Sequence, residues 1–329
     1  MSKPVIAVIG VGTMGHGIAQ VFALAGHRVR IFDEHPGALA SAPGRIRANL
    51  DLLIERGMLS ADAADEALAR LVRAASVEEA VGGAELVVEA VFENLALKHR
   101  VLAQIEAACP PDAVIASSTS NYRAAALASA LGRPERFLVT HFWSPPHIIP
   151  LVEVVPSAKT APATVERAQE LLRAAGRRPA LIRRDLPGFV GNRLQHALRR
   201  EAIALVDQGV ASPEDIDLIA RLSFGLRLPV TGPLETADLG GLDLSLAIQT
   251  SLLPELDRST EPTPTLRAKV ARGELGAKAG RGFFAWTAED HARRVRRRDR
   301  ALLDLLSLVE AYDAGEPPLA GADEQRGAA

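Results

Sequence analysis

The chain has 329 residues, of which 48% are hydrophobic and 24% are charged, and its 38 basic residues nearly balance its 40 acidic ones. This composition is typical of a globular protein with room for two cored domains, and it excludes a strongly basic chain that would bind nucleic acid or a membrane surface as a whole. The single cysteine, Cys109, cannot form an internal disulfide, which fits a reducing compartment. No apolar run approaches the ~20 residues that span a bilayer, and no signal peptide is expected, so we expect a soluble, cytoplasmic protein.

Short apolar runs alternate with helical stretches along the first half of the chain. Strands are expected at residues 5–9, 28–32, 86–91, 113–116, 137–142, 151–155 and 180–183. Helices are expected at residues 18–25, 95–109 and 161–175, and the Ala/Leu/Arg-rich segment 38–73 is expected to be a helical insertion. This alternation is typical of a parallel sheet that is covered by helices on both faces.

The strand pattern stops after Leu186, and the later periodic segments are helical. These helices are expected at residues 189–206, 213–222 and 242–253. The sequence therefore predicts an α/β domain over residues 1–186 and an all-α C-terminal domain over residues 187–312. Residues 313–329 are rich in Gly, Ala, Pro and acidic side chains, and they are expected to form a disordered tail.

A glycine-rich loop lies between the first expected strand and the first expected helix. Its residues are Gly10, Val11, Gly12, Thr13, Met14 and Gly15. The first glycine permits a tight turn, the second lets the backbone approach a pyrophosphate, and the third lets helix and strand pack closely. The N-terminus of the helix adds free N–H groups and a partial positive charge. In this context the loop predicts a dinucleotide-binding Rossmann domain with a mostly parallel sheet.

The end of the second expected strand indicates which dinucleotide is bound. Asp33 lies there, where a carboxylate accepts hydrogen bonds from a ribose 2′-OH and repels a 2′-phosphate. Residues 34–36 contain no arginine for such a phosphate, and Arg45 is expected to lie too far along the next helix. The sequence therefore predicts NAD rather than NADP.

Two further polar residues stand in apolar strands. His141 lies near the end of an expected strand, where α/β sheets place their ligands, and histidine is the usual base near neutral pH. Glu153 lies in the next strand, where a carboxylate is costly unless it is paired. A strand–loop–strand return could bring the two together, although they could also be unrelated polar residues. His147 leaves a metal site as an alternative, which no cysteine or second cluster supports, so no metal is expected.

At this point the sequence resembles the L-3-hydroxyacyl-CoA dehydrogenase family, from Val5 to about Trp286. The resemblance rests on the glycine loop with Asp33 and on residues 88–98 (VEAVFENLALK), 116–120 (ASSTS), 141–153, 187–193 (PGFVGNR), 232–235 (GPLE) and 276–283 (GAKAGRGF). It implies a Rossmann domain followed by a helical domain that forms the interface of a homodimer.

The resemblance also implies a role for each matching side chain. His141 matches the general base and Glu153 its partner, while Asn192 and Ser120 match residues that contact the substrate. The catalytic residues implied are therefore His141, Glu153, Asn192 and Ser120. Cofactor contacts beyond the glycine loop and Asp33 fall on Glu93, Lys98, Ser120, Ser144 and Lys278.

Two departures from the family pattern concern the substrate. Ser144 replaces the asparagine of the family's His-Phe-x-Asn-Pro motif. Asn49 and Arg56 fall where the family contacts CoA, but the surrounding residues 49–57 (NLDLLIERG) are not basic, which weakens the case for a substrate that carries several phosphate charges. Residues 147–156 (HIIPLVEVVP) resemble instead a branch that includes lambda-crystallin, L-gulonate 3-dehydrogenase and a dehydrogenase of pyridoxine breakdown, which act on hydroxy acids without CoA.

The leading hypothesis is an NAD-dependent dehydrogenase that oxidises the 3-hydroxy group of a 3-hydroxyacyl-CoA, such as 3-hydroxybutyryl-CoA. The alternative substrate is a free hydroxy acid such as L-gulonate or a hydroxymethyl-pyridine carboxylate. A non-catalytic NAD-binding protein of the crystallin kind is a second class, which the presence of both His141 and Glu153 disfavours. The basic run at residues 293–298 (RRVRRR) leaves nucleic-acid binding as a third class, although such a run is more often a solvated helix face.

Overall fold

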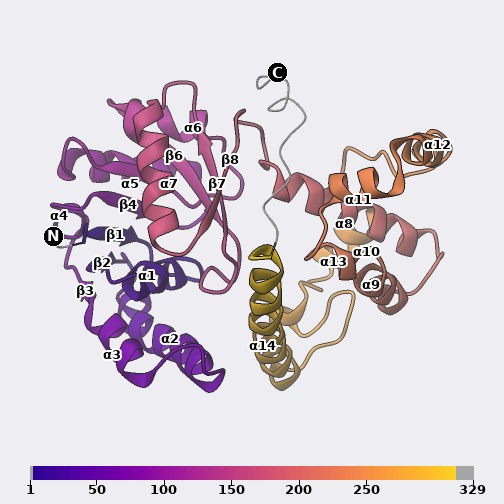
Figure 1. Cartoon of the computed structure of the whole chain (residues 1–329), viewed down its shortest axis with the longest axis horizontal. Coiled ribbons are helices and arrows are strands. Elements are labelled where there is room, and N and C mark those ends of the chain that lie inside the picture. Colours follow the sequence, from indigo (N-terminus) through magenta and orange to yellow (C-terminus); the bar gives the residue numbers. More distant parts are fainter. Residues whose placement is uncertain (1–2, 316–329) are drawn as a thin grey trace. The chain divides into compact units, whose positions relative to one another are not determined.

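The structure, a computed structural model, describes residues 3–315 (Figure 1). The chain forms two compact units that divide between Arg193 and Leu194, and each unit is described by itself. Within the described residues, no helix combines the length and the apolarity needed to cross a membrane. The boundary that the sequence predicts, after Leu186, stays a prediction.

The first unit is built on one eight-stranded sheet. Its strands are β1 (Ile6–Ile9), β2 (Val29–Phe32), β3 (Leu71–Arg73), β4 (Leu86–Glu89), β5 (Val114–Ser117), β6 (Phe137–Phe142), β7 (Leu151–Pro156) and β8 (Arg178–Leu181). Their order across the sheet is β3-β2-β1-β4-β5-β6-β7-β8. Neighbouring strands pair in parallel except β6 and β7, which are antiparallel. The prediction of a mostly parallel α/β sheet is confirmed.

Helices cover both faces of this sheet (Figure 1). They are α1 (Gly15–Leu24), α2 (Pro36–Glu55), α3 (Ala61–Ala69), α4 (Val77–Val81), α5 (Leu95–Ala108), α6 (Ala124–Ala128) and α7 (Pro162–Ala174). In β1, Ile6 and Val8 pack into the core under α1, α2, α3 and α7, whereas Ala7 and Ile9 pack into the core under α4, α5 and α6. Alternate side chains of a strand point to opposite faces, so the nearly continuous apolar runs are explained by a sheet that is buried on both sides.

One expectation about the first unit is wrong. The segment 38–73 is not entirely helical, because α2 and α3 are followed by the three-residue strand β3, which pairs with β2 at the edge of the sheet. Leu71 and Val72 are only partly buried there, so the strand has little of the apolar pattern that reveals a central strand.

Helix α8 (Gly191–Asp207) begins in the first unit and runs into the second. The second unit continues with α9 (Pro213–Leu222), α10 (Phe224–Arg227), α11 (Pro233–Gly240), α12 (Leu242–Leu252), α13 (Pro264–Ala271) and α14 (Ala288–Asp313). This confirms the helical C-terminal domain. Helix α14 extends to Asp313, which the sequence assigned to the tail, and residues 316–329 of that expected tail lie outside the described residues.

Candidate active site

The glycine-rich loop connects β1 to α1 at the edge where the parallel strands end. Gly10 has a φ of 89°, and a Cβ there would lie 2.7 Å from the Ala90 carbonyl and from the Val91 nitrogen. A Cβ on Gly15 would collide with the Gly10 carbonyl oxygen. Only glycine fits at both positions, so the loop is a backbone cradle of the kind that a pyrophosphate needs.

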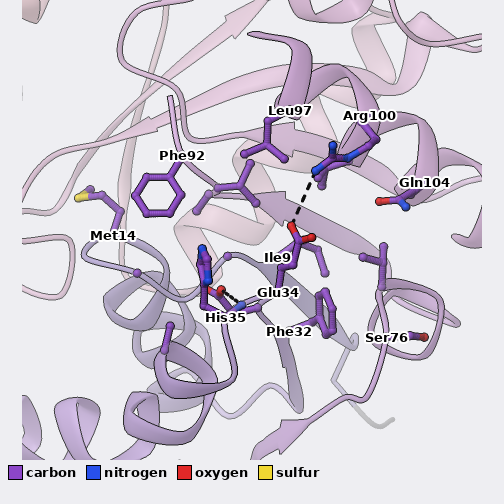
Figure 2. Close-up of a pocket in the computed structure, with 18 of the residues that line it drawn as sticks. Ile9, Met14, Phe32, Glu34, His35, Ser76, Phe92, Leu97, Arg100 and Gln104 are labelled. Atoms are coloured by element: carbon purple, nitrogen blue, oxygen red, sulfur yellow. Dashed lines mark hydrogen bonds and ion pairs between the residues drawn. The ribbon is translucent and has the colours of Figure 1, made fainter. Parts of the chain in front are cut away.

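A pocket of about 490 Å³ opens beside this loop (Figure 2). Gly10, Gly12, Asp33, Phe92 and Leu97 are among the residues that line it. Asp33 is fixed by backbone donors, since its Oδ2 accepts from the Val11 N–H at 2.8 Å and its Oδ1 from the His35 N–H at 2.9 Å. The volume, the glycine cradle and the fixed carboxylate fit the adenosine half of a dinucleotide.

Two arginines near this pocket have different surroundings. The expectation that Arg45 lies too far along its helix is wrong, because Arg45 reaches the loop: it donates to the carbonyl oxygens of Val11 at 2.6 Å and Gly12 at 3.0 Å, and these bonds support the backbone of the glycine loop. Arg100, from α5, lines the pocket and lies 3.8 Å from Glu34, as Figure 2 shows. The sequence did not reveal Arg100, because its approach to β2 depends on how α5 packs over the sheet.

His141 and Glu153 face each other directly across the antiparallel pair of β6 and β7. Their side chains are both buried, and the His141 Nδ1 lies 2.7 Å from the Glu153 Oε2. A carboxylate only accepts hydrogen bonds, so the proton is assigned to Nδ1 and the Nε2 keeps its lone pair. The Ser120 Oγ lies 2.9 Å from that Nε2 and can donate to it. The strand–loop–strand return therefore pairs His141 with Glu153, and the loop after β5 adds Ser120, which completes a Ser120–His141–Glu153 chain of hydrogen bonds.

The second carboxylate oxygen of Glu153 is held by the turn that leads into α8. Its Oε1 accepts from the N–H groups of Val190 and Gly191, each at 3.0 Å. Gly188 (φ 76°) and Phe189 (φ 51°) have left-handed backbones, and for phenylalanine that conformation is uncommon. This turn aims both amides at the carboxylate.

The same turn is packed against the ring of His141. The buried ring of Phe189 lies 5.3 Å from the His141 ring, measured between ring centroids. The ring of Trp143 also contacts the His141 ring, at 5.2 Å. A Cβ on Gly191 would collide with the Trp143 indole. Aromatic packing therefore limits how the imidazole can rotate.

The electrostatics of Glu153 favour its charged form. Burial raises the pKa of this carboxyl, but the hydrogen bonds from His141, Gly191 and Val190 outweigh burial, so the pKa lies below its ordinary value. A carboxylate held in this way can orient the imidazole and stabilise the imidazolium that forms when Nε2 accepts a proton. The arrangement can therefore act as an oriented general base.

Of the other predicted site residues in the first unit, Asn192 lies beside the Ser120–His141–Glu153 hydrogen bonds, whereas, in the described part of the chain, Ser144 and Asn49 form no hydrogen bond with these three residues. The Asn192 Nδ2 donates to the Ser120 carbonyl oxygen at 3.1 Å, which brings it beside the Ser120–His141 contact. Ser144 is exposed in the loop after β6. Asn49 turns toward α1, where its Nδ2 donates to the Gln20 Oε1 at 2.9 Å, and Arg56 is exposed at the end of α2.

Lys98 and Glu93 form a second polar group at the ends of β4 and β5. The Lys98 Nζ is buried and lies 3.3 Å from the Glu93 Oε2 and 2.8 Å from the Glu89 Oε1. Glu89 has no role in the sequence-based site, although it was visible as a carboxylate in an apolar strand. Lys278 lies in a short 3₁₀ helix, Ala277–Ala279, of the second unit, and its cofactor contact stays a prediction.

Fold and site together define a class, that of dehydrogenases with an NAD-binding Rossmann domain and a histidine–carboxylate pair on two neighbouring strands of the sheet. Residues 5–186 match the NAD binding domain of 3-hydroxyacyl-CoA dehydrogenase, and residues 188–286 match the C-terminal domain of the same enzyme. The chain belongs to the 3-hydroxyacyl-CoA dehydrogenase family of NAD-dependent oxidoreductases. NAD is therefore its cofactor, as the sequence predicts.

Relatives within the family act on different substrates. A 5-formyl-3-hydroxy-2-methylpyridine 4-carboxylate 5-dehydrogenase of Mesorhizobium japonicum is 35% identical over 94% of this chain and 99% of its own length. A probable 3-hydroxybutyryl-CoA dehydrogenase of Deinococcus radiodurans is 39% identical over 85% of this chain and 99% of its own length. A solved structure described as a 5-formyl-3-hydroxy-2-methylpyridine 4-carboxylic acid 5-dehydrogenase, an NAD⁺-dependent dismutase, covers 93% of this chain and 98% of its own with a TM-score of 0.87 at 34% identity.

Proposed function

We propose that this protein is an NAD-dependent dehydrogenase that oxidises the hydroxyl group of a hydroxy acid or of its acyl thioester to a carbonyl group, with His141 as the general base; for a 3-hydroxyacyl compound this is the 3-hydroxy group, and the product is the 3-keto compound. The observation that carries the proposal is the buried Ser120–His141–Glu153 chain, in which Nδ1 is held by a carboxylate at 2.7 Å and Nε2 faces a hydroxyl at 2.9 Å. A substrate hydroxyl that lies beside Ser120 can give its proton to this Nε2.

The remaining residues act on that proton and on the position of the substrate. Bound NAD supplies the acceptor for the hydride that leaves the carbon bearing the hydroxyl group, while the hydroxyl proton goes to His141. Glu153 stabilises the imidazolium that results. Ser120 shares the Nε2 with the substrate hydroxyl, and Asn192, beside Ser120, is suited to donate to the developing carbonyl oxygen. Both the proton and the hydride are thereby accounted for.

The test is an NADH-formation assay with wild type and His141→Ala. We expect turnover to be lost in the variant while NAD affinity is kept, and an unchanged kcat would contradict the mechanism. Wild-type protein that binds NAD but turns over no substrate would favour the non-catalytic, crystallin-like alternative. The same assay with NADP tests the role of Asp33, because equal efficiency with both cofactors would refute it.

For the form of the substrate, the surface of α2 favours a free hydroxy acid. The helix contains no lysine. Arg47 is paired with Asp51 at 2.8 Å and also contacts Asp65, while Asn49 is hydrogen-bonded to Gln20 rather than turned outward. A CoA thioester brings several phosphate charges, which would find few uncommitted cations along this helix. Substrates of this kind include L-gulonate and a hydroxymethyl-pyridine carboxylate; the Mesorhizobium relative is named for a formyl-pyridine carboxylate, which also carries no CoA.

A CoA thioester such as 3-hydroxybutyryl-CoA is the second candidate, and the family itself supports it. It would place the protein in fatty acid metabolism. A substrate panel separates the two: 3-hydroxybutyryl-CoA, longer acyl-CoAs, free 3-hydroxy acids, L-gulonate and the pyridine carboxylate. A kcat/KM for 3-hydroxybutyryl-CoA that exceeds those of the free acids would reverse our preference.

We also propose that the protein is a cytoplasmic homodimer that associates through its second unit. Helices α9 to α13 contain no buried residue, yet they carry large apolar side chains that are at least 62% exposed. Among these are Leu226, Leu234, Leu239, Leu242 and Leu246. Such a surface marks an interface. Sedimentation is expected to give a dimer for wild type and a monomer for the Leu234→Glu/Leu239→Glu variant; a monomeric wild type would contradict the proposal.

A further inference from the structure

Glu89 is the last residue of β4, and its side chain is completely buried. Its Oε1 accepts from the Lys98 Nζ and from the Val91 N–H, both at 2.8 Å, and its Oε2 accepts from the Ser117 Oγ at 2.6 Å. A buried carboxylate is expensive unless its lone pairs are used, and here three donors use them. The group is therefore a built site at the ends of two central strands.

The ammonium group of Lys98 is equally constrained. Its side chain is 1% exposed, and its three N–H groups face three acceptors. These are the Glu89 Oε1 at 2.8 Å, the Val91 carbonyl oxygen at 3.2 Å and the Glu93 Oε2 at 3.3 Å. Glu93 is the most exposed of the three residues, with a side chain that is 39% exposed, whereas Val91 is partly buried and Glu89 completely so. One N–H of Lys98 thus points to the open side of the site, and two point inward.

The backbone beside this ion pair forms a wall of the glycine cradle. The Ala90–Val91 peptide lies 2.7 Å from where a Cβ of Gly10 would be, and the Val91 N–H is the one that Glu89 holds. Thr119 and Asn121, just after β5, donate to the Glu93 Oε1, with the Asn121 N–H at 3.2 Å. Glu89, Lys98 and Glu93 therefore form one network that borders the cofactor loop.

We propose that Glu89 is a positioning residue for the nicotinamide-ribose end of NAD. It holds Lys98 so that the outward N–H, which faces Glu93 in this structure, is donated to the cofactor when NAD binds. The inference rests on the proposed function. Lys98 contacts Glu93, and Glu93 is bound by Thr119 and Asn121 on either side of Ser120. Since Ser120 is the residue beside the proposed base His141, the group lies toward the end of the cofactor where the hydride is accepted. It adds a residue that touches neither cofactor nor substrate, and it explains why an ammonium is buried at a place where an apolar side chain would be cheaper.

The test compares the binding of NAD with that of ADP, which lacks the nicotinamide ribose, by isothermal titration. In Glu89→Gln the amide oxygen still accepts from Val91, but the charge that holds Lys98 is lost. We expect the Kd for NAD to rise about tenfold and the Kd for ADP to change less than twofold. Glu34→Gln, at the adenosine end of the pocket, is the matched control and is expected to change both constants by the same factor.

A second variant separates positioning from simple charge balance. Glu89→Gln leaves Lys98 buried without its carboxylate and can lower Tm, whereas Glu89→Gln/Lys98→Met removes both charges and is expected to restore Tm. If Glu89 positions Lys98, the double variant still binds NAD about tenfold more weakly and ADP normally. Recovery of wild-type NAD affinity in the double variant, or an equal loss for NAD and ADP in Glu89→Gln, would overturn the inference.

The binding experiment is independent of the proposed reaction. Lys98→Met with an unchanged Kd for NAD would remove the ground for Glu89 while leaving the role of His141 intact. Conversely, a loss of NAD affinity in Lys98→Met and Glu89→Gln would support the inference even if no substrate of the panel were oxidised.

Discussion

Two carboxylates in apolar strands, Glu89 in β4 and Glu153 in β7, are each paired with a buried basic side chain. The Glu89–Lys98 distance is 2.8 Å and the Glu153–His141 distance is 2.7 Å. All four side chains are at most 3% exposed. The two pairs are therefore alike in burial and in the distance between the carboxylate and the basic group.

They differ in the contacts that the basic partner keeps for other groups. Lys98 donates two of its three N–H groups to Glu89 and to the Val91 carbonyl oxygen, and these hydrogen bonds hold its ammonium group in place. His141 bonds to Glu153 through Nδ1, and its Nε2 faces the Ser120 hydroxyl, where a proton can be exchanged. We propose accordingly that a buried carboxylate with a basic partner holds a charge in one pair and supports proton transfer in the other, depending on the outward contact of the basic group.

The largest effect is expected from His141→Ala. Removal of a general base should lower kcat by about 10³-fold, with the Kd for NAD kept within about twofold. Lys98→Met is the matched substitution in the other pair, and it should raise the Kd for NAD while lowering kcat at saturating NAD far less. The comparison breaks if steady-state kinetics give the two variants the same profile.

Glu153→Gln should have the next largest effect. The amide oxygen can still accept from Val190 and Gly191, but the NH₂ group then faces Nδ1 and favours the tautomer with its proton on Nε2. Since that tautomer cannot accept the substrate proton, we expect kcat to fall on the order of 10²-fold or more. For Glu89→Gln, kcat at saturating NAD should fall much less. An equal fall in kcat for the two variants would remove the distinction between the pairs.

A smaller effect, whose direction can be predicted, is expected in the pH dependence of the unfolding free energy, because of the lowered pKa of Glu153. Its pKa in the folded protein lies below the ordinary value of 4.5. The carboxylate therefore contributes stability that is present above the unfolded pKa and is lost as the pH falls through the lower folded pKa, at about 1.4 kcal/mol for each unit of depression. The difference in unfolding free energy between wild type and Glu153→Gln should shrink below pH 4.5, and a difference that grows there would reverse the sign.

The smallest effect is expected from Ser117→Ala. This variant removes the donor to the Glu89 Oε2 and should cost about 1 kcal/mol of unfolding free energy in urea titrations, with kcat nearly unchanged. Ser120→Ala is its counterpart at His141 and should lower kcat with little change in stability. An unfolding free energy that does not respond to Ser117→Ala would mean that Glu89 does not need its third donor.

Much of this fold could be predicted from the sequence, because a sheet buried on both faces produces continuous apolar runs between helices. The strand at 137–142 coincides with β6, whose residues are all buried. The strand β3 was missed because three partly buried residues at an edge carry too little pattern. Arg100 was missed because its approach to Glu34 is a product of helix packing, which no local spacing encodes.

The site was predictable to the extent that its residues carry a local cost. Glu153 was noticed because a carboxylate in the strand LVEVV needs a partner. Glu89 in LVVEAV is likewise a carboxylate in an apolar strand, so the same argument predicts a buried partner for it, and that partner is Lys98. The amides of Val190 and Gly191 could not be inferred in this way, since they reach Glu153 only through the left-handed backbone of Gly188 and Phe189.

Glu153 accepts hydrogen bonds from the N–H groups of Val190, the residue before α8, and of Gly191, the first residue of α8. Helix α8 continues from the first unit into the second. The Glu153 carboxylate therefore connects β7 to the start of α8 by hydrogen bonds, in addition to its contact with His141. Any displacement that draws the start of α8 away from β7 must break hydrogen bonds to Glu153, and with them part of the support that keeps His141 oriented. Under the proposed mechanism, the orientation of the base therefore depends on the position of the first residues of α8 against β7.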